Sequence, residues 1–415
     1  MEFYENRQAP ERALLVGVDT GEYDCDASLA ELEELASTAG AEVAGVLSQK
    51  LENPNPATYI GSGRLREVKD FCQQNKIDLL IADGELSPAQ QRNLEKETGV
   101  RVVDRTTLIL DIFAQRARSS EGKIQVELAQ LNYALPRLRG KGQSLSRLGG
   151  GIGTRGPGES KLESDRRHIR RRIYALEETL RQIEKRRNAQ RTRRKKDGVI
   201  SVAIVGYTNA GKSTLMNYLT SAGVLAEDKL FATLDPTARK LTLPNGQAVM
   251  LIDTVGLVRR LPHHLVEAFK STLEEARDAD LILNVCDASS AECADHIQVT
   301  ENLLRELGAE HTPVITLMNK CDLIPSIYDV VTMGKTVCIS AKTGEGVENL
   351  LTEMEKALSR KRMRATLLIP FDKGGILAEI RQNGQVLSEE YLPEGTRAEV
   401  VAEANDLEKY KPYFV

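Results

Sequence analysis

The chain has 415 residues and a formal net charge of −4, and 41% of its residues are hydrophobic, 28% charged and 4% aromatic. These values are typical of a soluble protein of several domains and exclude a disordered or fibrous chain. The absence of a long apolar stretch, of a basic and apolar leader and of any CxxC pair predicts a cytoplasmic protein without a membrane span, zinc site or disulfide framework.

The first domain that we expect, residues 1–104, alternates apolar runs with helical patterns. The runs that predict buried strands lie at 13–19, 43–47, 78–82 and 101–104. Helices are predicted at 28–39 and 63–75. This alternation is typical of a small α/β domain with a parallel sheet.

The second expected domain, residues 105–197, has two apolar stripes in which successive residues are four, three, four and three positions apart. The first consists of Ile124, Leu128, Leu131, Leu135 and Leu138, and the second of Ile169, Ile173, Leu176, Leu180 and Ile183. Two such stripes predict an antiparallel helical hairpin whose helices bury them against each other. We expect Pro136 to kink or end the first helix.

The connection between these helices, residues 139–158, contains eight glycines and the basic residues Arg139, Lys141, Arg147 and Arg155. Such a loop cannot contribute to a core, so it indicates either a segment that a partner orders or a disordered linker. The following residues 161–197 hold 15 Lys or Arg and six Asp or Glu, a local charge of +9. A basic segment of this kind usually binds phosphate or an anionic surface, although a solvated helix face explains the composition equally well.

A second α/β pattern extends over residues 198–360, and a small α+β domain is expected over 364–415. In the latter, strands are predicted at 365–370 and 397–402 and a helix at 375–382. The fold class that we expect is therefore an α/β multidomain protein, whose larger α/β domain is preceded by a small α/β domain and the helical hairpin.

The strongest motif follows the buried strand at 202–205. It has the pattern GxxxxGK[ST] and opens a helix, and it comprises Gly206, Tyr207, Thr208, Asn209, Ala210, Gly211, Lys212 and Ser213. In this setting the motif predicts a P-loop, whose backbone N–H groups and helix N-terminus bind the α- and β-phosphates of a nucleotide. We expect Lys212 to contribute charge near the β- and γ-phosphates, and Ser213 to ligate Mg²⁺.

Three further motifs, each after its own strand, select the base and the nucleotide state. They are Asp253, Thr254, Val255 and Gly256; Asn319, Lys320, Cys321 and Asp322; and Ser340, Ala341 and Lys342. Asp253 can hold Mg²⁺ through water, and the Gly256 N–H can meet the γ-phosphate. The Asp322 carboxylate can accept two hydrogen bonds from guanine but not from adenine, and the third motif supplies backbone N–H groups to the guanine oxygen. Asn319 is expected to brace the loops, and the Lys320 stem to lie along the base. The four motifs together predict binding of GTP and GDP.

This ordered set of motifs resembles that of the translation-factor-like GTPases. With residues 231–237, the glycine-rich hairpin and residues 149–160, the chain is similar to the HflX family of ribosome-associated GTPases over nearly its whole length. The resemblance implies a GTPase that binds the large ribosomal subunit through ribosomal RNA and splits or remodels ribosomes under stress. We expect such a protein to act as a monomer.

The resemblance also implies a nucleotide-sensing segment made of Phe231, Ala232, Thr233, Leu234 and Asp235. In the family pattern Thr233 ligates Mg²⁺ and senses the γ-phosphate, although Thr237 could do so by geometry. Together with Lys212 and Gly256, Thr233 is the residue that we expect to act in hydrolysis.

Two positions bear on the rate of hydrolysis. Many GTPases orient the attacking water with a glutamine just after DxxG, whereas this chain has Leu257 there, which cannot form a hydrogen bond through its side chain. Slow basal turnover and stimulation by a docked partner are therefore predicted. By the family resemblance, Asn209 either helps to hold K⁺ or forms hydrogen bonds within the loop.

Two alternatives to ribosomal docking remain open. One is a membrane-surface regulatory GTPase, which would be partly membrane-associated, but the narrow apolar stripe of the basic helix lacks Trp and Phe and suits helix pairing better. The other is a GTPase associated with RNA modification, which would need a catalytic domain that the sequence does not reveal.

Overall fold

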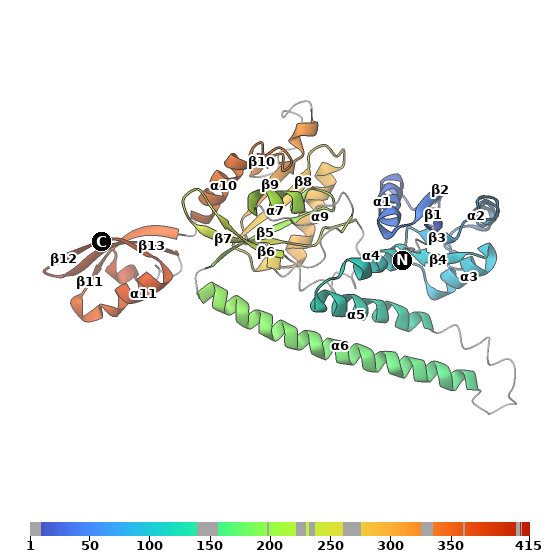
Figure 1. Cartoon of the computed structure of the whole chain (residues 1–415), viewed down its shortest axis with the longest axis horizontal. Coiled ribbons are helices and arrows are strands. Elements are labelled where there is room, and N and C mark those ends of the chain that lie inside the picture. The colour runs from blue at the N-terminus through green and yellow to red at the C-terminus, as the bar shows by residue number, and fades with distance from the viewer. Residues whose placement is uncertain are drawn as a thin grey trace, which may run out of the picture. The chain divides into compact units, whose positions relative to one another are not determined.

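The computed structural model describes residues 10–138, 157–196, 199–220, 230–231, 237–259, 275–324, 335–359, 362–403, 407 and 409–415. The chain divides into two compact units (Figure 1). The first contains Met1–Ile183, Glu227–Asp235 and Gly256–Ser271, and the second contains Glu184–Ala226, Pro236–Val255 and Thr272–Val415.

A four-stranded parallel sheet begins the first unit. Its strands are β1 (Arg12–Asp19), β2 (Glu42–Lys50), β3 (Leu79–Ala82) and β4 (Arg101–Asp104), in the order β2-β1-β3-β4. The β1 and β3 strands are buried along almost their whole length, as the apolar runs predict. The parallel α/β arrangement expected from the sequence is confirmed.

Four helices accompany this sheet, two of which the sequence patterns did not indicate. They are α1 (Cys25–Ala39), α2 (Ser62–Asn75), α3 (Pro88–Thr98) and α4 (Arg105–Arg116). The α3 helix begins with a capping box, in which Ser87 and Gln90 exchange hydrogen bonds between side chain and backbone. Asp104 is the N-cap of the α4 helix, and its carboxylate accepts a hydrogen bond from the Thr107 N–H.

The helical hairpin consists of α5 (Ser120–Arg137) and α6 (Pro157–Lys196). The α5 helix ends next to Pro136, as expected. Its buried residues are Gly122, Gln125, Val126, Ala129 and Tyr133, so the prediction that the stripe from Ile124 to Leu138 forms its buried face is wrong. The α5 helix packs on α4 through that other face, which leaves the predicted stripe half-buried. In α6, all five residues of the predicted stripe are at least half-buried, and Leu176 is its buried member.

The second unit is built on a six-stranded sheet. Its strands are β5 (Ile200–Gly206), β6 (Thr237–Thr242), β7 (Ala248–Asp253), β8 (Leu281–Asp287), β9 (Val314–Asn319) and β10 (Thr336–Cys338). The order is β10-β9-β8-β5-β7-β6, and all neighbours are parallel except β6 and β7. The helices described around it are α7 (Lys212–Thr220), α9 (Cys293–Glu306) and α10 (Val347–Ser359). Because the strands are parallel, the motifs that follow β5, β7, β9 and β10 meet at one edge of the sheet.

A small α+β domain follows. Strands β11 (Arg362–Ile369), β12 (Gln385–Leu392) and β13 (Gly395–Glu403) form an antiparallel sheet in the order β11-β13-β12, and helix α11 (Gly375–Asn383) packs on it. The predicted strands and helix are confirmed, and β12 is an addition to them. Across the described part of the chain, no helix has the length and apolarity needed to cross a membrane.

Candidate nucleotide-binding site

The loop between β5 and α7 depends on two glycines. Gly206 has a φ of 145°, and a Cβ there would lie 2.1 Å from the Val285 carbonyl oxygen. Gly211 has a φ of 94°, and a Cβ there would lie 2.2 Å from Nδ2 of Asn319. Because side chains disfavour this backbone region and the space is filled, only glycine fits either position. The loop thus adopts the tight strand-to-helix turn that the motif predicts.

Lys212 begins α7 and lies buried beneath this loop. Its Nζ donates to the carbonyl oxygens of Gly206, at 3.0 Å, and Tyr207, at 2.7 Å. Burial lowers the pKa of the Lys212 ammonium to about 8, an effect that the Asp253 carboxylate opposes. The backbone of the P-loop therefore surrounds the ammonium of Lys212, the lysine of the same motif.

A hydroxyl and a carboxylate come together beside the lysine. The Ser213 Oγ lies 3.2 Å from Oδ2 of Asp253, which ends β7 and is fully buried. The next residue, Thr254, donates through its N–H and its hydroxyl to the Ile204 carbonyl, at 3.2 and 2.7 Å. These bonds hold the end of β7 against β5, so the first and second motifs are adjacent.

Asn319 joins two other motifs, as the sequence predicts. Its Nδ2 donates to the Ala210 carbonyl at 2.8 Å, and its Oδ1 accepts from the Ala341 N–H at 2.8 Å. The side chain is buried. One amide therefore connects the P-loop to the loop after β10.

The neighbours of Asn319 take different positions. Lys320 has a φ of 63°, and its Nζ pairs with Oδ2 of Asp287 at 2.6 Å. The Cys321 N–H donates to the Ile339 carbonyl at 3.2 Å, while Asp322 is exposed. The loop after β10 contains the buried residues Ser340 and Ala341 and the exposed residue Lys342. The structure thus brings both predicted base-recognition loops to the same sheet edge as the P-loop.

Two features of the P-loop side chains, one contact and one buried hydroxyl, escaped the sequence analysis, which assigns no role to His296. The Tyr207 ring stacks on the His296 ring of α9, with centroids 3.8 Å apart and planes 13° from parallel. The Thr208 hydroxyl is buried, and among the described residues it has no hydrogen-bond partner, so a bound ligand could satisfy it. No sequence signal would have linked His296 to Tyr207, which lie in different elements.

The segment expected to sense the nucleotide, residues 231–235, and the residues from Gly256 onward belong to the first unit. Residues 232–235, which include Ala232, Thr233, Leu234 and Asp235, lie outside the described residues, as does most of the glycine-rich loop. Phe231 is buried, with its ring 4.6 Å from the Phe113 ring of α4. After Gly256 and the buried Leu257, the Arg259 carbonyl accepts from Arg105 at 3.4 Å. Within the first unit, both segments therefore contact the N-terminal domain.

Three of the cysteines are unsuited to nucleophilic chemistry. All six are free, and burial raises the pKa of Cys72 to about 11 and that of Cys286 and Cys321 to about 12. Such thiols stay protonated at neutral pH and react slowly. Within the described ranges, no three His, Cys, Asp or Glu side chains are placed to hold a metal ion together.

Four family models match successive parts of the chain. They are the GTP-binding GTPase N-terminal region at residues 26–114, the GTP-binding GTPase middle region at 116–194, the 50S ribosome-binding GTPase at 201–320 and the HflX C-terminal domain at 327–408. The GDP complex of a GTP-binding protein from Sulfolobus solfataricus, a solved structure, is 27% identical and has a TM-score of 0.45, covering 84% of this chain and 99% of that one.

Relatives of known family cover almost the whole sequence. The GTPase HflX of Caldanaerobacter subterraneus subsp. tengcongensis is 54% identical over 400 residues, which are 95% of this chain and 92% of that protein. The GTPase HflX of Escherichia coli K12 is 41% identical over 397 residues, 94% of this chain and 93% of that protein. With these identities and the P-loop architecture, the chain belongs to the HflX family of GTPases.

Proposed function

We propose that this GTPase docks on the large ribosomal subunit through α6 and the glycine-rich loop, and that docking stimulates GTP hydrolysis. The observation that carries the proposal is the exposure of basic side chains along the 40 residues of α6. The exposed ones include Arg167, Arg170, Arg171, Arg172, Arg181, Lys185, Arg186 and Arg193. Such a surface attracts RNA phosphates without reading base sequence.

The arrangement of α6 favours RNA over a lipid surface. Its apolar stripe holds the shielded positions, and Arg172 forms a two-pronged ion pair with Glu127 of α5, at 2.6 and 2.8 Å. The apolar stripe is thus partly covered within the chain, whereas a membrane-surface helix would need it free for insertion. The match to the 50S ribosome-binding GTPase model also supports a ribosomal partner.

We assign the nucleotide contacts as follows. The N–H groups of the P-loop and of α7 bind the α- and β-phosphates, and Lys212 exchanges its carbonyl partners for phosphate oxygens. Gly256 contacts the γ-phosphate. The Asp322 carboxylate accepts from the N1–H and the amine of guanine, and the loop of Ser340, Ala341 and Lys342 donates to its oxygen. Asn319 holds the P-loop and the loop after β10 in fixed positions relative to each other.

Ser213 and Asp253 fit Mg²⁺, because a hydroxyl and a carboxylate oxygen 3.2 Å apart are the hard donors that this ion prefers. The ion would neutralise phosphate charge during transfer. We place the Ser213 hydroxyl and Thr233 as its protein ligands, with Asp253 acting through water. Asn209, with a φ of 58°, is a second candidate cation ligand, for K⁺. A comparison of turnover in K⁺ and in Na⁺ tests that role.

The hydrolytic machinery of the chain alone is incomplete, because the side chain of Leu257 cannot orient water. We propose that the docked ribosome positions Thr233 for the reaction or supplies the missing group. Energy released by docking and hydrolysis would then serve to split or remodel ribosomes under stress, in the cytoplasm, by a monomer. Sedimentation of intact ribosomes with the protein and GTP tests this, since splitting predicts free subunits and no splitting leaves the ribosome peak unchanged.

The docking itself is tested by binding to purified large subunits at several salt concentrations. Arg170→Gln/Arg171→Gln removes two exposed charges from α6, and Arg92→Gln/Lys96→Gln removes two from α3 as the matched control. We expect the first variant alone to bind more weakly. The slope of the logarithm of its binding constant against the logarithm of the salt concentration should become less steep by about 2, one for each lost phosphate contact. Equal binding by all three proteins, or displacement by anionic vesicles but not by RNA, would refute the proposal.

A further inference from the structure

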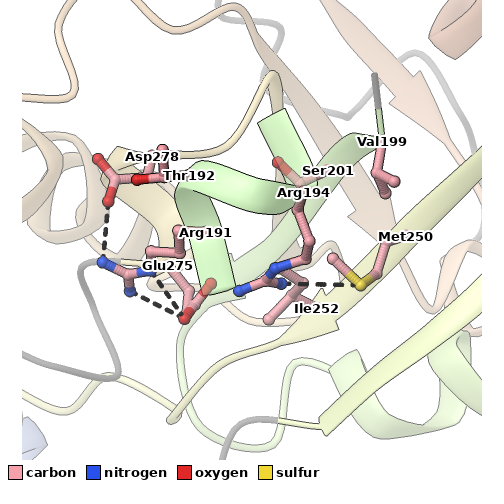
Figure 2. Close-up of a pocket in the computed structure, with 9 residues that line it drawn as sticks. All are labelled: Arg191, Thr192, Arg194, Val199, Ser201, Met250, Ile252, Glu275 and Asp278. Carbon is pink, nitrogen blue, oxygen red and sulfur yellow. Dashed lines mark hydrogen bonds and ion pairs between the residues drawn. The ribbon is translucent and has the colours of Figure 1, made fainter. Parts of the chain in front are cut away.

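Among the described side chains of the basic helix, one arginine is buried. Arg191, near the end of α6, donates from Nε and Nη2 to Oε1 of Glu275, at 3.2 and 2.8 Å, and from Nη1 to Oδ2 of Asp278, at 2.9 Å. Figure 2 shows its guanidinium between the two carboxylates. The side chains of Arg191 and Glu275 are 9% and 10% exposed. An ion pair this buried is stable only with good geometry, and this arginine is not available to RNA.

The carboxylates that hold Arg191 lie at an informative place in the chain. Glu275 and Asp278 immediately precede β8. In the chain they come after the Asp253–Gly256 motif and residues 257–274. Segments after this motif are the ones that GTPases rearrange when the γ-phosphate is present or lost. Arg191 thus connects the end of α6 to the residues just before β8, which follow that motif in the chain.

Other contacts of the same end of α6 lead to the nucleotide loops. The Arg194 carbonyl accepts from the Val199 N–H at 3.0 Å, at the start of the strand that ends in the P-loop. The Arg194 guanidinium contacts the Met250 sulfur at 3.8 Å, on the strand that ends at Asp253. These side chains border a pocket of about 180 Å³ that also adjoins Glu275 (Figure 2). The end of α6 therefore contacts the start of β5, the strand β7 and the Glu275–Asp278 segment, and β5 and β7 each lead to a nucleotide-binding motif.

We propose that Arg191 is a positioning residue that couples α6 to the nucleotide state, by holding the Glu275–Asp278 segment against the end of the helix. A rearrangement after Gly256 then alters the last turns of α6, and a force on α6 alters that segment in return. The inference rests on GTP binding by the chain and is independent of ribosomal docking.

Amide hydrogen exchange of the full chain, with GDP and with a non-hydrolysable GTP analogue, tests the coupling. In the wild type, we expect exchange at residues 187–196 and 275–280 to differ between the two nucleotides. Arg191→Met/Glu275→Met replaces the ion pair by apolar side chains of similar length, and Arg186→Met removes an exposed arginine of the same helix as the control. The double variant should lose the difference at residues 187–196 but keep it at the P-loop, and the control should keep both.

Two results of the exchange experiment would overturn the proposal. One is that exchange at residues 187–196 of the wild type does not differ between the two nucleotides, and the other is that the double variant keeps such a difference. If the double variant loses protection throughout the second unit, it has failed to fold, and Arg191→Lys decides instead. That variant keeps the charge but cannot bridge both carboxylates as the planar guanidinium does, so we expect it to reduce the difference, and an unchanged difference contradicts the inference.

Discussion

The N-terminal sheet and the larger, mostly parallel sheet both have strands that end in buried aspartates, but the two sheets use these aspartates differently. In the N-terminal sheet, Asp83 follows β3 and accepts from Ser28 at 2.8 Å and from Arg105 at 2.8 Å. Asp104 ends β4 and accepts from the Leu86 N–H at 3.0 Å and from the Tyr133 hydroxyl. Side chains and backbone of the same domain surround these carboxylates.

In the larger sheet, the corresponding edge is built from backbone loops. Asp253 lies beside the Ser213 hydroxyl, and Lys212 donates to main-chain carbonyls of its own loop. Gly206 and Gly211 keep side chains out of the turn. The difference teaches that a parallel sheet provides the position for a site, while the residues after each strand decide whether that position becomes a structural core or a phosphate site.

The largest effect that we predict tests the structural edge. Asp104→Ala removes the acceptor of Leu86 and Tyr133 and the N-cap of α4, and it should destabilise the N-terminal domain by about 3 kcal/mol. Urea denaturation followed by hydrogen exchange in residues 10–138 measures this loss. GTP affinity should stay unchanged, and a parallel loss of affinity would show that this edge contributes to nucleotide binding.

Gly211→Ala tests the nucleotide edge. The new Cβ would collide with Asn319, so GTP affinity should fall about 100-fold, or ~2.7 kcal/mol, as measured by equilibrium binding. Gly246→Ala is the matched control, because Gly246 has a similar φ of 82° but a Cβ added there would meet nothing within 4 Å. If both variants lose equal affinity, backbone strain rather than the close approach to Asn319 is responsible.

Asp322→Asn sharpens the assignment of the base loop. An amide cannot accept both hydrogen bonds of guanine, so affinity for GTP should fall about 30-fold, or ~2 kcal/mol. Xanthosine triphosphate, which presents an oxygen in place of the guanine amine, should bind this variant better than the wild type. Competition binding measures both, with the exposed Asp372→Asn as control, and unchanged base preference contradicts the assignment.

His296→Ala should have the smallest effect. Loss of the stack on Tyr207 removes about 1 kcal/mol of support for the P-loop, which would lower GTP affinity about fivefold. His311→Ala, an exposed histidine outside the site, should bind GTP as the wild type does. An equal result for the two variants would mean that the stack does not position the loop.

Much of the fold and of the nucleotide-binding site could be predicted from the sequence, because the strands and the P-loop turn have strong local sequence signals. The buried runs identify the four strands of the N-terminal sheet and the strands that precede the four motifs of the larger sheet, but not β6 or β8. The glycines of the P-loop require one type of turn. The capping box from Ser87 to Gln90 could have revealed α3. The buried face of α5 could not be chosen from spacing alone, since contact with α4 shields Val126 and Ala129 rather than Ile124. The stack of Tyr207 on His296 likewise depends on how α9 packs, which no local pattern encodes.

Steady-state GTP hydrolysis, with and without purified large ribosomal subunits and at two salt concentrations, tests the central claim most directly. That claim is that the chain binds GTP with its own residues but needs a docked partner to complete hydrolysis, because Leu257 cannot orient water. We predict slow turnover by the chain alone and an increase of about tenfold or more with subunits, since groups supplied in trans to GTPases accelerate them strongly. The increase should weaken at high salt. Fast turnover without any partner, or no stimulation at either salt concentration, would contradict the account.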